Sequence, residues 1–181
     1  MAVRTQAVQV MIRGLVLAAL LVGFLAAAQI PGRDPLTPQE ADQVRNTAGE
    51  LNRRIPLLLR FAQERVTRFA RVRRQPRSAP GRSARMYALL RQYQEILPEL
   101  NDAMDELAAN PRPPGGPKYN VRKILDPVIA TEQHLATVLQ NIQQSSSAAD
   151  LATYRFELQN CLDATRDSLQ NAEQDRGGAR P

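Results

Sequence analysis

Histidine and cysteine each occur once among the 181 residues, and tryptophan does not occur. A lone histidine, His134, cannot supply the paired imidazoles of His-rich metal sites or of di-iron helical bundles within one chain. A lone cysteine, Cys161, cannot form an internal disulfide bond. The chain also lacks a CxxCH motif, a glycine-rich phosphate loop and a Gly-x-Ser-x-Gly elbow. We therefore expect no enzymatic activity, no metal and no cofactor.

Two residues could still suggest such chemistry. Cys161 lies on or beside an apolar stripe, and its nearest base is Arg166, so we interpret it as a buried small hydrophobic residue. A haem-binding bundle ligated by His134 and by Met86 or Met104 is the alternative among cofactor proteins. It would require both ligands to face one polar cavity.

The N-terminal residues are typical of an export signal. Arg4 and Arg13 accompany an apolar run of fifteen residues over 14–28, and Ala26 and Ala28 supply an A-x-A cleavage site. A membrane-spanning helix usually needs ~20 apolar residues, so this run is short for a permanent anchor. We predict a signal peptide over 1–28 and a bacterial protein that is exported, periplasmic or secreted; an uncleaved anchor is the alternative.

Loop-forming residues divide the rest of the chain. Segments rich in Pro, Gly or Ser occur at 31–35, 75–82, 110–118 and 145–150, and no stretch alternates with the period of a strand. Between them, apolar residues recur every three or four positions, as in amphipathic helices. We predict a linker over 29–36, a helical domain over 37–175 and a disordered tail over 176–181. The fold class is all-α, an up-down four-helix bundle with a long, Pro-kinked first helix.

The helix boundaries follow from capping residues. The first helix should run over 38–74 behind a capping box of Thr37 and Glu40. The second should cover 84–108 after Ser83, the third 120–144, and the fourth should follow Asp150 as N-cap. A straight helix over 38–74 would span about 55 Å, longer than its neighbours, so it must bend, split or overhang.

Three prolines interrupt these patterns. The apolar stripes continue in phase across Pro56 and Pro98, which favours kinks at these positions. Pro127 could either kink the third helix or stand in its first turn, which would start the helix late. The sequence leaves this choice open.

Arginine is concentrated in one segment. Residues 53–91 contain twelve arginines and one acid, Glu64. On a helical projection Arg53, Arg60 and Arg71 lie opposite the apolar stripe, so they should face solvent or a partner. The segment has no helix-turn-helix or zinc signature and no evident stacking aromatics, and an exported protein meets little nucleic acid. We therefore predict no nucleic-acid binding.

The arginines instead suggest binding of a protein partner or an anionic envelope surface, as charged hydrogen-bond donors. The predicted partner-binding residues are Arg60, Arg71, Arg73, Arg74 and Arg77. One alternative is a solvated face that pairs with acidic helices of the same bundle. Another is a periplasmic chaperone-like cradle for unfolded clients, which an exposed apolar patch beside the arginines would favour.

Two stretches carry a resemblance. LTPQEADQVRNTAGELNRRIPLLLRFAQER (36–65) and YNVRKILDPVIATEQHLATVLQ (119–140) are similar to segments of an uncharacterised family of exported, all-helical bacterial proteins. The resemblance implies export and a helical fold, and it implies no activity or site. Leu36 and Thr37 also match the start of the Leu-Thr-x-x-Gln motif of Spy-type periplasmic chaperones, but Glu40 replaces the glutamine.

Overall fold

The computed structural model describes residues 34–112, 115 and 118–178. Within these ranges all regular secondary structure is helical, which confirms the all-α prediction. The helices are α2 (Pro38–Arg45), α3 (Leu51–Arg73), α4 (Arg82–Ala109), α5 (Val121–Ser145) and α6 (Ala148–Gly177). The predicted signal peptide lies outside the described residues. None of the helices in the described part is long and apolar enough to cross a membrane.

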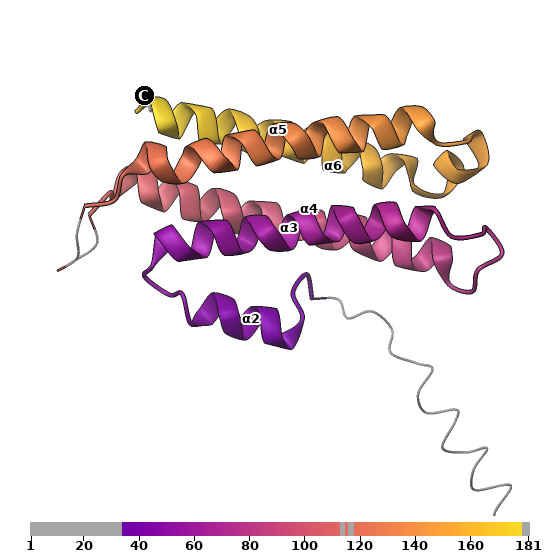
Figure 1. Cartoon of the computed structure of the whole chain (residues 1–181), viewed down its shortest axis with the longest axis horizontal. Helices are drawn as coiled ribbons and strands as arrows, with labels where there is room; N and C mark the ends of the chain where they lie inside the picture. Colours follow the sequence, from indigo (N-terminus) through magenta and orange to yellow (C-terminus); the bar gives the residue numbers. More distant parts are fainter. Residues whose placement is uncertain (1–33, 113–114, 116–117, 179–181) are drawn as a thin grey trace, which may run out of the picture. The chain divides into compact units, whose positions relative to one another are not determined.

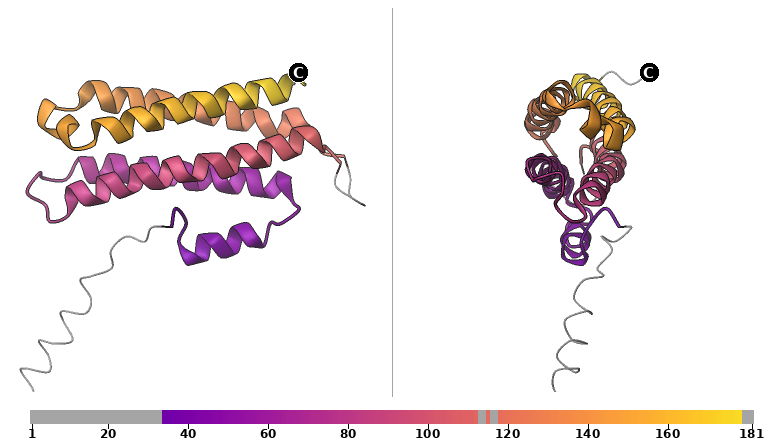
Figure 2. Two further views of the ribbon diagram at one scale, coloured as in Figure 1. Left: turned by 180° about the vertical axis from the view of Figure 1, so that it is seen from behind. Right: turned by 90° about the vertical axis from the view of Figure 1, so that its right-hand side faces the viewer.

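The four long helices lie side by side, and successive ones run in opposite directions (Figure 1). α3 packs against α4 and α5, and α6 packs against the same two helices. Viewed end-on in Figure 2, α3 and α5 occupy one side and α4 and α6 the other. α2 packs on the outside of α3. The seam between α3 and α5 is the most sparsely packed of the four long seams, which leaves grooves along it.

The apolar stripes of the sequence form one continuous core. Ile55, Leu58 and Phe69 of α3 are fully buried. The ring of Phe69 packs edge-on against Tyr154 of α6, with 5.3 Å between centroids. Burial of apolar side chains at about 25 cal/mol per Å² is the main stabilising contribution to such a bundle. The core also fixes which arginines of α3 face outward.

The first predicted helix splits into α2 and α3, which is one of the three outcomes that its length left open. The chain turns at 46–50, where Gly49 adopts φ +78°, a conformation that favours glycine. The Thr47 hydroxyl donates to Val44 O at 2.7 Å, and Ala48 is exposed. The division therefore falls at Gly49, while α3 continues through Pro56.

The other boundaries are close to those predicted. α4 continues through Pro98, and α5 begins at Val121 behind Asn120, so Pro127 lies inside α5. α6 extends to Gly177, two residues into the predicted tail.

Three capping residues were predicted, and one is confirmed. Thr37 N donates to Glu40 Oε2 at 2.7 Å and Glu40 N donates to Thr37 Oγ1 at 3.3 Å, so the capping box forms. Ser83 is wrong as the cap of α4, which begins at Arg82 after Gly81 in a left-handed conformation. Asp150 is wrong as the cap of α6. Ser147 takes that position and accepts from Asp150 N at 3.2 Å.

Candidate anion-binding site

The five predicted arginines fall into two groups, those held by neighbours and those without a partner. Arg60 belongs to the first group. It donates to Gln43 Oε1 at 3.0 Å, lies 4.0 Å from Glu64 Oε1, and stacks over the Phe61 ring. Arg60 is exposed, but its guanidinium is therefore already engaged on its own helix and on α2.

Arg73 and Arg77 hold the turn between α5 and α6. Arg73 donates to Ser146 Oγ at 3.3 Å, while Arg77 donates to Ser147 and lies 3.4 Å from Asp150 Oδ2. These bonds join segments that are about seventy residues apart in sequence. Two of the predicted partner-binding arginines thus have a structural role at this end of the bundle.

Arg82, which sequence reasoning missed, completes the same arrangement. Its guanidinium donates to Asp150 Oδ1 at 3.0 Å and to the Arg73 carbonyl at 2.7 Å, and it is 5% exposed. Burial alone would raise the pKa of Asp150, but hydrogen bonds from Arg82 and Ser147 outweigh it and lower that pKa. No sequence signal separates Arg82 from the other arginines of the loop.

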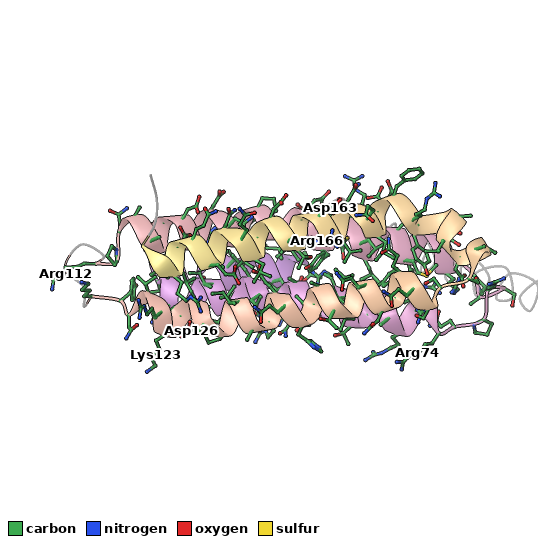
Figure 3. All side chains as sticks on the ribbon, turned by 90° about the horizontal axis from the view of Figure 1, so that it is seen from above. Arg74, Arg112, Lys123, Asp126, Asp163 and Arg166 are labelled. Atoms are coloured by element: carbon green, nitrogen blue, oxygen red, sulfur yellow. The ribbon has the colours of Figure 1, made fainter. Side chains whose placement is uncertain are left out.

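Arg71 and Arg74 form the second group. Among the described residues neither guanidinium has a hydrogen bond or an ion pair. Arg71 lies near the end of α3 and Arg74 directly follows the helix, and both are exposed. In Figure 3, Arg74 extends outward from the ribbon.

These two arginines line a groove of about 340 Å³ between α3 and α5. Gln63 and Thr67 of α3 and His134 of α5 add polar groups to its wall. The floor is apolar and consists of Val66, Ala70, Leu135 and Val138. Guanidinium groups beside an apolar floor bind anions more strongly than they do in open water, because the local dielectric constant is lower.

The charges around this groove are of one sign. No aspartate or glutamate lines it, and α3 as a whole carries seven arginines and one glutamate. That glutamate, Glu64, lines a neighbouring hollow, where Arg68 donates to it at 3.2 Å. The groove is therefore an excess-positive site whose arginines are available to an external anion.

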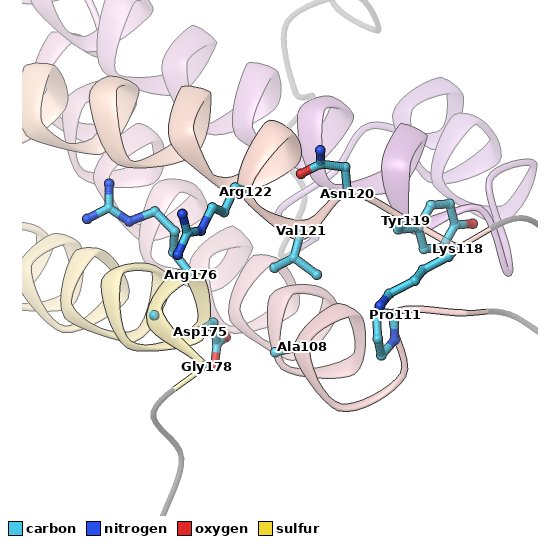
Figure 4. Close-up of a pocket in the computed structure, with 11 residues that line it drawn as sticks. Ala108, Pro111, Lys118, Tyr119, Asn120, Val121, Arg122, Asp175, Arg176 and Gly178 are labelled. Atoms are coloured by element: carbon cyan, nitrogen blue, oxygen red, sulfur yellow. The ribbon is translucent and has the colours of Figure 1, made fainter.

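A second hollow lies at the opposite end of the bundle, where α4 and α6 end and α5 begins (Figure 4). It measures about 580 Å³, and Tyr119 N closes its loop by donating to Pro111 O at 2.6 Å. Asp175 lines it together with Lys118, Arg122 and Arg176. Unlike the groove that Arg71 and Arg74 line, this hollow has a carboxylate in its wall.

The residues predicted as haem ligands in the alternative interpretation lie in different environments. Met86 and Met104 are fully buried in the core, and His134 is exposed on α5. Neither methionine lines the groove that His134 lines. No cluster of three metal-ligating side chains occurs in the part of the chain that the structure describes.

Sequence reasoning also missed a buried polar cluster in the core. Glu132 of α5 is 0% exposed, and its Oε1 lies 2.5 Å from Ser168 Oγ of α6. Ser168 Oγ lies 2.6 Å from Asn101 Oδ1 of α4, and Glu132 Oε2 has no hydrogen-bond partner. Burial raises the pKa of Glu132 to about 7. The available signal was a glutamate on the apolar stripe between Val128 and Leu135.

No protein-family model, curated protein or solved structure matches the chain. The resemblance to exported all-helical proteins therefore stays an expectation.

Proposed function

We propose that the chain is an exported, non-enzymatic up-down four-helix bundle that binds anionic groups of a protein partner or of an envelope surface. The residues that bind are Arg71 and Arg74. The observation that carries this proposal is their lack of any internal partner, whereas Arg73 and Arg77 at the same end are used within the fold.

The groove offers suitable chemistry for a carboxylate or a phosphate. Each guanidinium presents five N–H donors in a planar fork, which matches the oxygens of either group. The side chains of Gln63, Thr67 and His134 can add hydrogen bonds from the same wall. An anion bound there would gain several charge-assisted hydrogen bonds without displacing an internal ion pair.

The predicted export of the chain decides between classes of anion. Outside the cytoplasm the abundant anions are phospholipid head groups, wall polymers and acidic proteins, so nucleic acid is not proposed as the ligand. The signal peptide predicted over residues 1–28 is the basis of this part of the proposal.

The chaperone-like alternative lacks a supporting observation. It would be favoured by a broad exposed apolar patch beside the arginines. In the described part of the chain, the exposed large hydrophobic residues are Tyr87 on α4 and Phe156 on α6. Neither lines the groove between α3 and α5.

The test is crosslinking in the native cell envelope, followed by identification of the molecules recovered with the protein. The variant carrying Arg71→Ser and Arg74→Ser is expected to lose them. Arg155→Ser is the matched control, because Arg155 is also exposed but stacks on Phe156 of α6. An unchanged set of crosslinked molecules with the double variant would contradict the proposal.

A further inference from the structure

A second groove lies on the seam between α3 and α5, nearer the start of both helices. It measures about 400 Å³ and is bounded by Pro56 of α3 and Pro127 of α5, which are both exposed. Its floor is apolar, with Leu59, Ile124 and Val128. The Pro56–Pro127 groove, as we call it, has two properties that point to a ligand.

The first property is a pair of backbone acceptors. Proline has no N–H, so each proline deprives the carbonyl four residues earlier of its usual helical donor. For Pro56 that carbonyl belongs to Asn52, and for Pro127 it belongs to Lys123. Asn52 and Lys123 both line the groove. Two helices thus each bring to this groove a residue whose carbonyl lacks its usual helical donor.

The second property is the charge of the rim. Lys118 and Lys123 line the groove, both are exposed, and neither has an ion pair or side-chain hydrogen bond among the described residues. No aspartate or glutamate lines the groove. A ligand that complements the site therefore needs negative charge, apolar surface and N–H donors.

An acidic peptide combines these three features. Its backbone amides donate hydrogen bonds, its carboxylates pair with lysine, and its apolar side chains can cover the floor. We infer that the Pro56–Pro127 groove binds an extended acidic segment of a partner protein. This inference rests on the proposed function and deepens it, since it assigns the partner to the class of peptides and adds a second contact.

The same peptide can reach both grooves. Lys123 and His134 are eleven positions apart on α5, which corresponds to about 16 Å at 1.5 Å per residue. About five extended residues cover this distance at ~3.3 Å each. An acidic peptide of about ten residues would therefore contact Lys118 and Lys123 at one end and Arg71 and Arg74 at the other.

A membrane surface fits the seam less well than a peptide does. A phospholipid acyl chain has no N–H to donate to the two carbonyls. A narrow ligand such as an extended peptide can enter the two grooves of the seam, whose walls contain no aspartate or glutamate among the described residues.

The test uses fluorescence anisotropy with a labelled peptide of about ten glutamate and leucine residues, long enough to span both grooves at ~3.3 Å per residue. Lys118→Glu with Lys123→Glu should weaken its binding at least tenfold. Arg155→Glu, which reverses one exposed charge on α6, should leave it unchanged. A peptide of the same sequence with N-methylated amides should bind at least fivefold more weakly, because it keeps its charge and loses its donors.

Each result bears on the inference. If the lysine variant binds the peptide as well as the unmodified protein does, the inference is overturned. This holds even if the Arg71→Ser and Arg74→Ser variant binds the peptide more weakly, a result that would support the proposed function. Weakening by the lysine variant alone supports the Pro56–Pro127 groove and contradicts the arginine site. If the N-methylated peptide binds as well as the unmethylated one, the inference is overturned. It is also overturned if the protein binds phosphatidylglycerol vesicles but not the peptide.

Discussion

Arg65 of α3 donates to both carboxylate oxygens of Glu40 in α2, at 3.0 and 2.5 Å, across 25 residues of sequence. Arg65 is 1% exposed and Glu40 7% exposed, so both charges are removed from water. The same guanidinium donates to Pro35 O at 2.9 Å. This buried pair fixes α2 and the segment before it to the bundle, and it sets Arg65 apart from the solvent-facing arginines of α3.

Removal of Glu40 should strongly destabilise the fold. Glu40→Ala leaves Arg65 buried without a counter-charge, which typically costs about 3–5 kcal/mol in the free energy of unfolding. Asp42→Ala is the matched control in the same helix. Its pair with Arg45 is exposed and should contribute less than about 1 kcal/mol. Urea denaturation measures both, and equal losses would contradict the assigned role of the buried pair.

Glu40 should also shape the stability in acid. Burial raises its pKa, but hydrogen bonds from Arg65 and Thr37 outweigh this effect and the pKa is lowered. The unfolded chain therefore binds this proton more readily, so the stabilisation is present above the unfolded pKa of about 4.5 and is lost as the pH falls through the folded value. Glu40→Gln should reduce the loss of stability between pH 5 and pH 3, measured by thermal unfolding. If the Glu40→Gln variant loses as much stability between pH 5 and pH 3 as the unmodified protein, this role of Glu40 is contradicted.

Glu132 should have the opposite effect on stability. Its folded pKa, about 7, lies above the unfolded value of 4.5, so the free energy of unfolding falls as the pH rises between these values and levels off above them. A protonated Glu132 can donate to Ser168, which can then donate to Asn101, so the geometry suits the neutral acid.

Glu132→Gln should remove this pH dependence. The variant should match the unmodified protein near pH 4.5 and exceed it by on the order of 3 kcal/mol at pH 8, since the folded pKa of about 7 lies well above 4.5 and one pKa unit corresponds to about 1.4 kcal/mol. Denaturant unfolding at the two pH values checks this. A variant less stable than the unmodified protein at pH 8 would show that Glu132 is held ionised.

Arg77 of the α3–α4 loop and Arg82, the first residue of α4, should differ in their effects on stability. Arg82→Ala removes a buried guanidinium together with its hydrogen bonds to Asp150 Oδ1 and the Arg73 carbonyl, which should cost about 2–3 kcal/mol. Arg77→Ala removes an exposed guanidinium and should cost less than about 1 kcal/mol. Thermal melts of the two variants provide the comparison, and the reverse order would refute the assignment of Arg82 to the fold.

Arg71 and Arg74 should contribute little to stability. Because neither has a partner in the described residues, the double serine variant should unfold within about 0.5 kcal/mol of the unmodified protein. The same denaturation experiment measures this. A large destabilisation would mean that these side chains serve the fold and would weaken the proposed binding role.

Cys161 should be inert in the folded protein. It is 0% exposed, and burial raises the pKa of its thiol to about 12, so little thiolate forms at neutral pH. A thiol reagent should label it only after denaturation, and no disulfide-linked dimer should form. Rapid labelling of the native protein would show that the core opens at this position.

The sequence predicts much of the fold because the four long helices follow simple rules. Their apolar stripes run unbroken between segments rich in Pro, Gly and Ser, so their number and approximate limits could be read directly. The length of the first helix left a split open, but its position at Gly49 was missed because the apolar spacing continues across it and a single glycine is tolerated in helices. The capping errors at Ser83 and Asp150 arose because several residues in each loop are suitable caps.

The candidate site was predicted only in part, because the sequence shows where charged residues are concentrated but not which of them are paired. The sequence identified a segment rich in arginine, but arginines with and without internal partners look the same until residues far apart in sequence are brought together. Arg73 and Arg77 are engaged by the α5–α6 turn, which lies about seventy positions away. Arg65 and Glu132 sit on apolar stripes, and this mismatch between residue type and position was the only available sign of their buried contacts.

The two sides of the bundle differ in their content of charged residues. α3 carries seven arginines and one carboxylate, and α4 and α6 together carry eleven carboxylates and six arginines. Such a separation makes the molecule an electric dipole across its short dimension. The electric field of an acidic partner, as proposed above, would rotate the protein toward the binding orientation before any contact forms. Association should therefore be faster at low ionic strength.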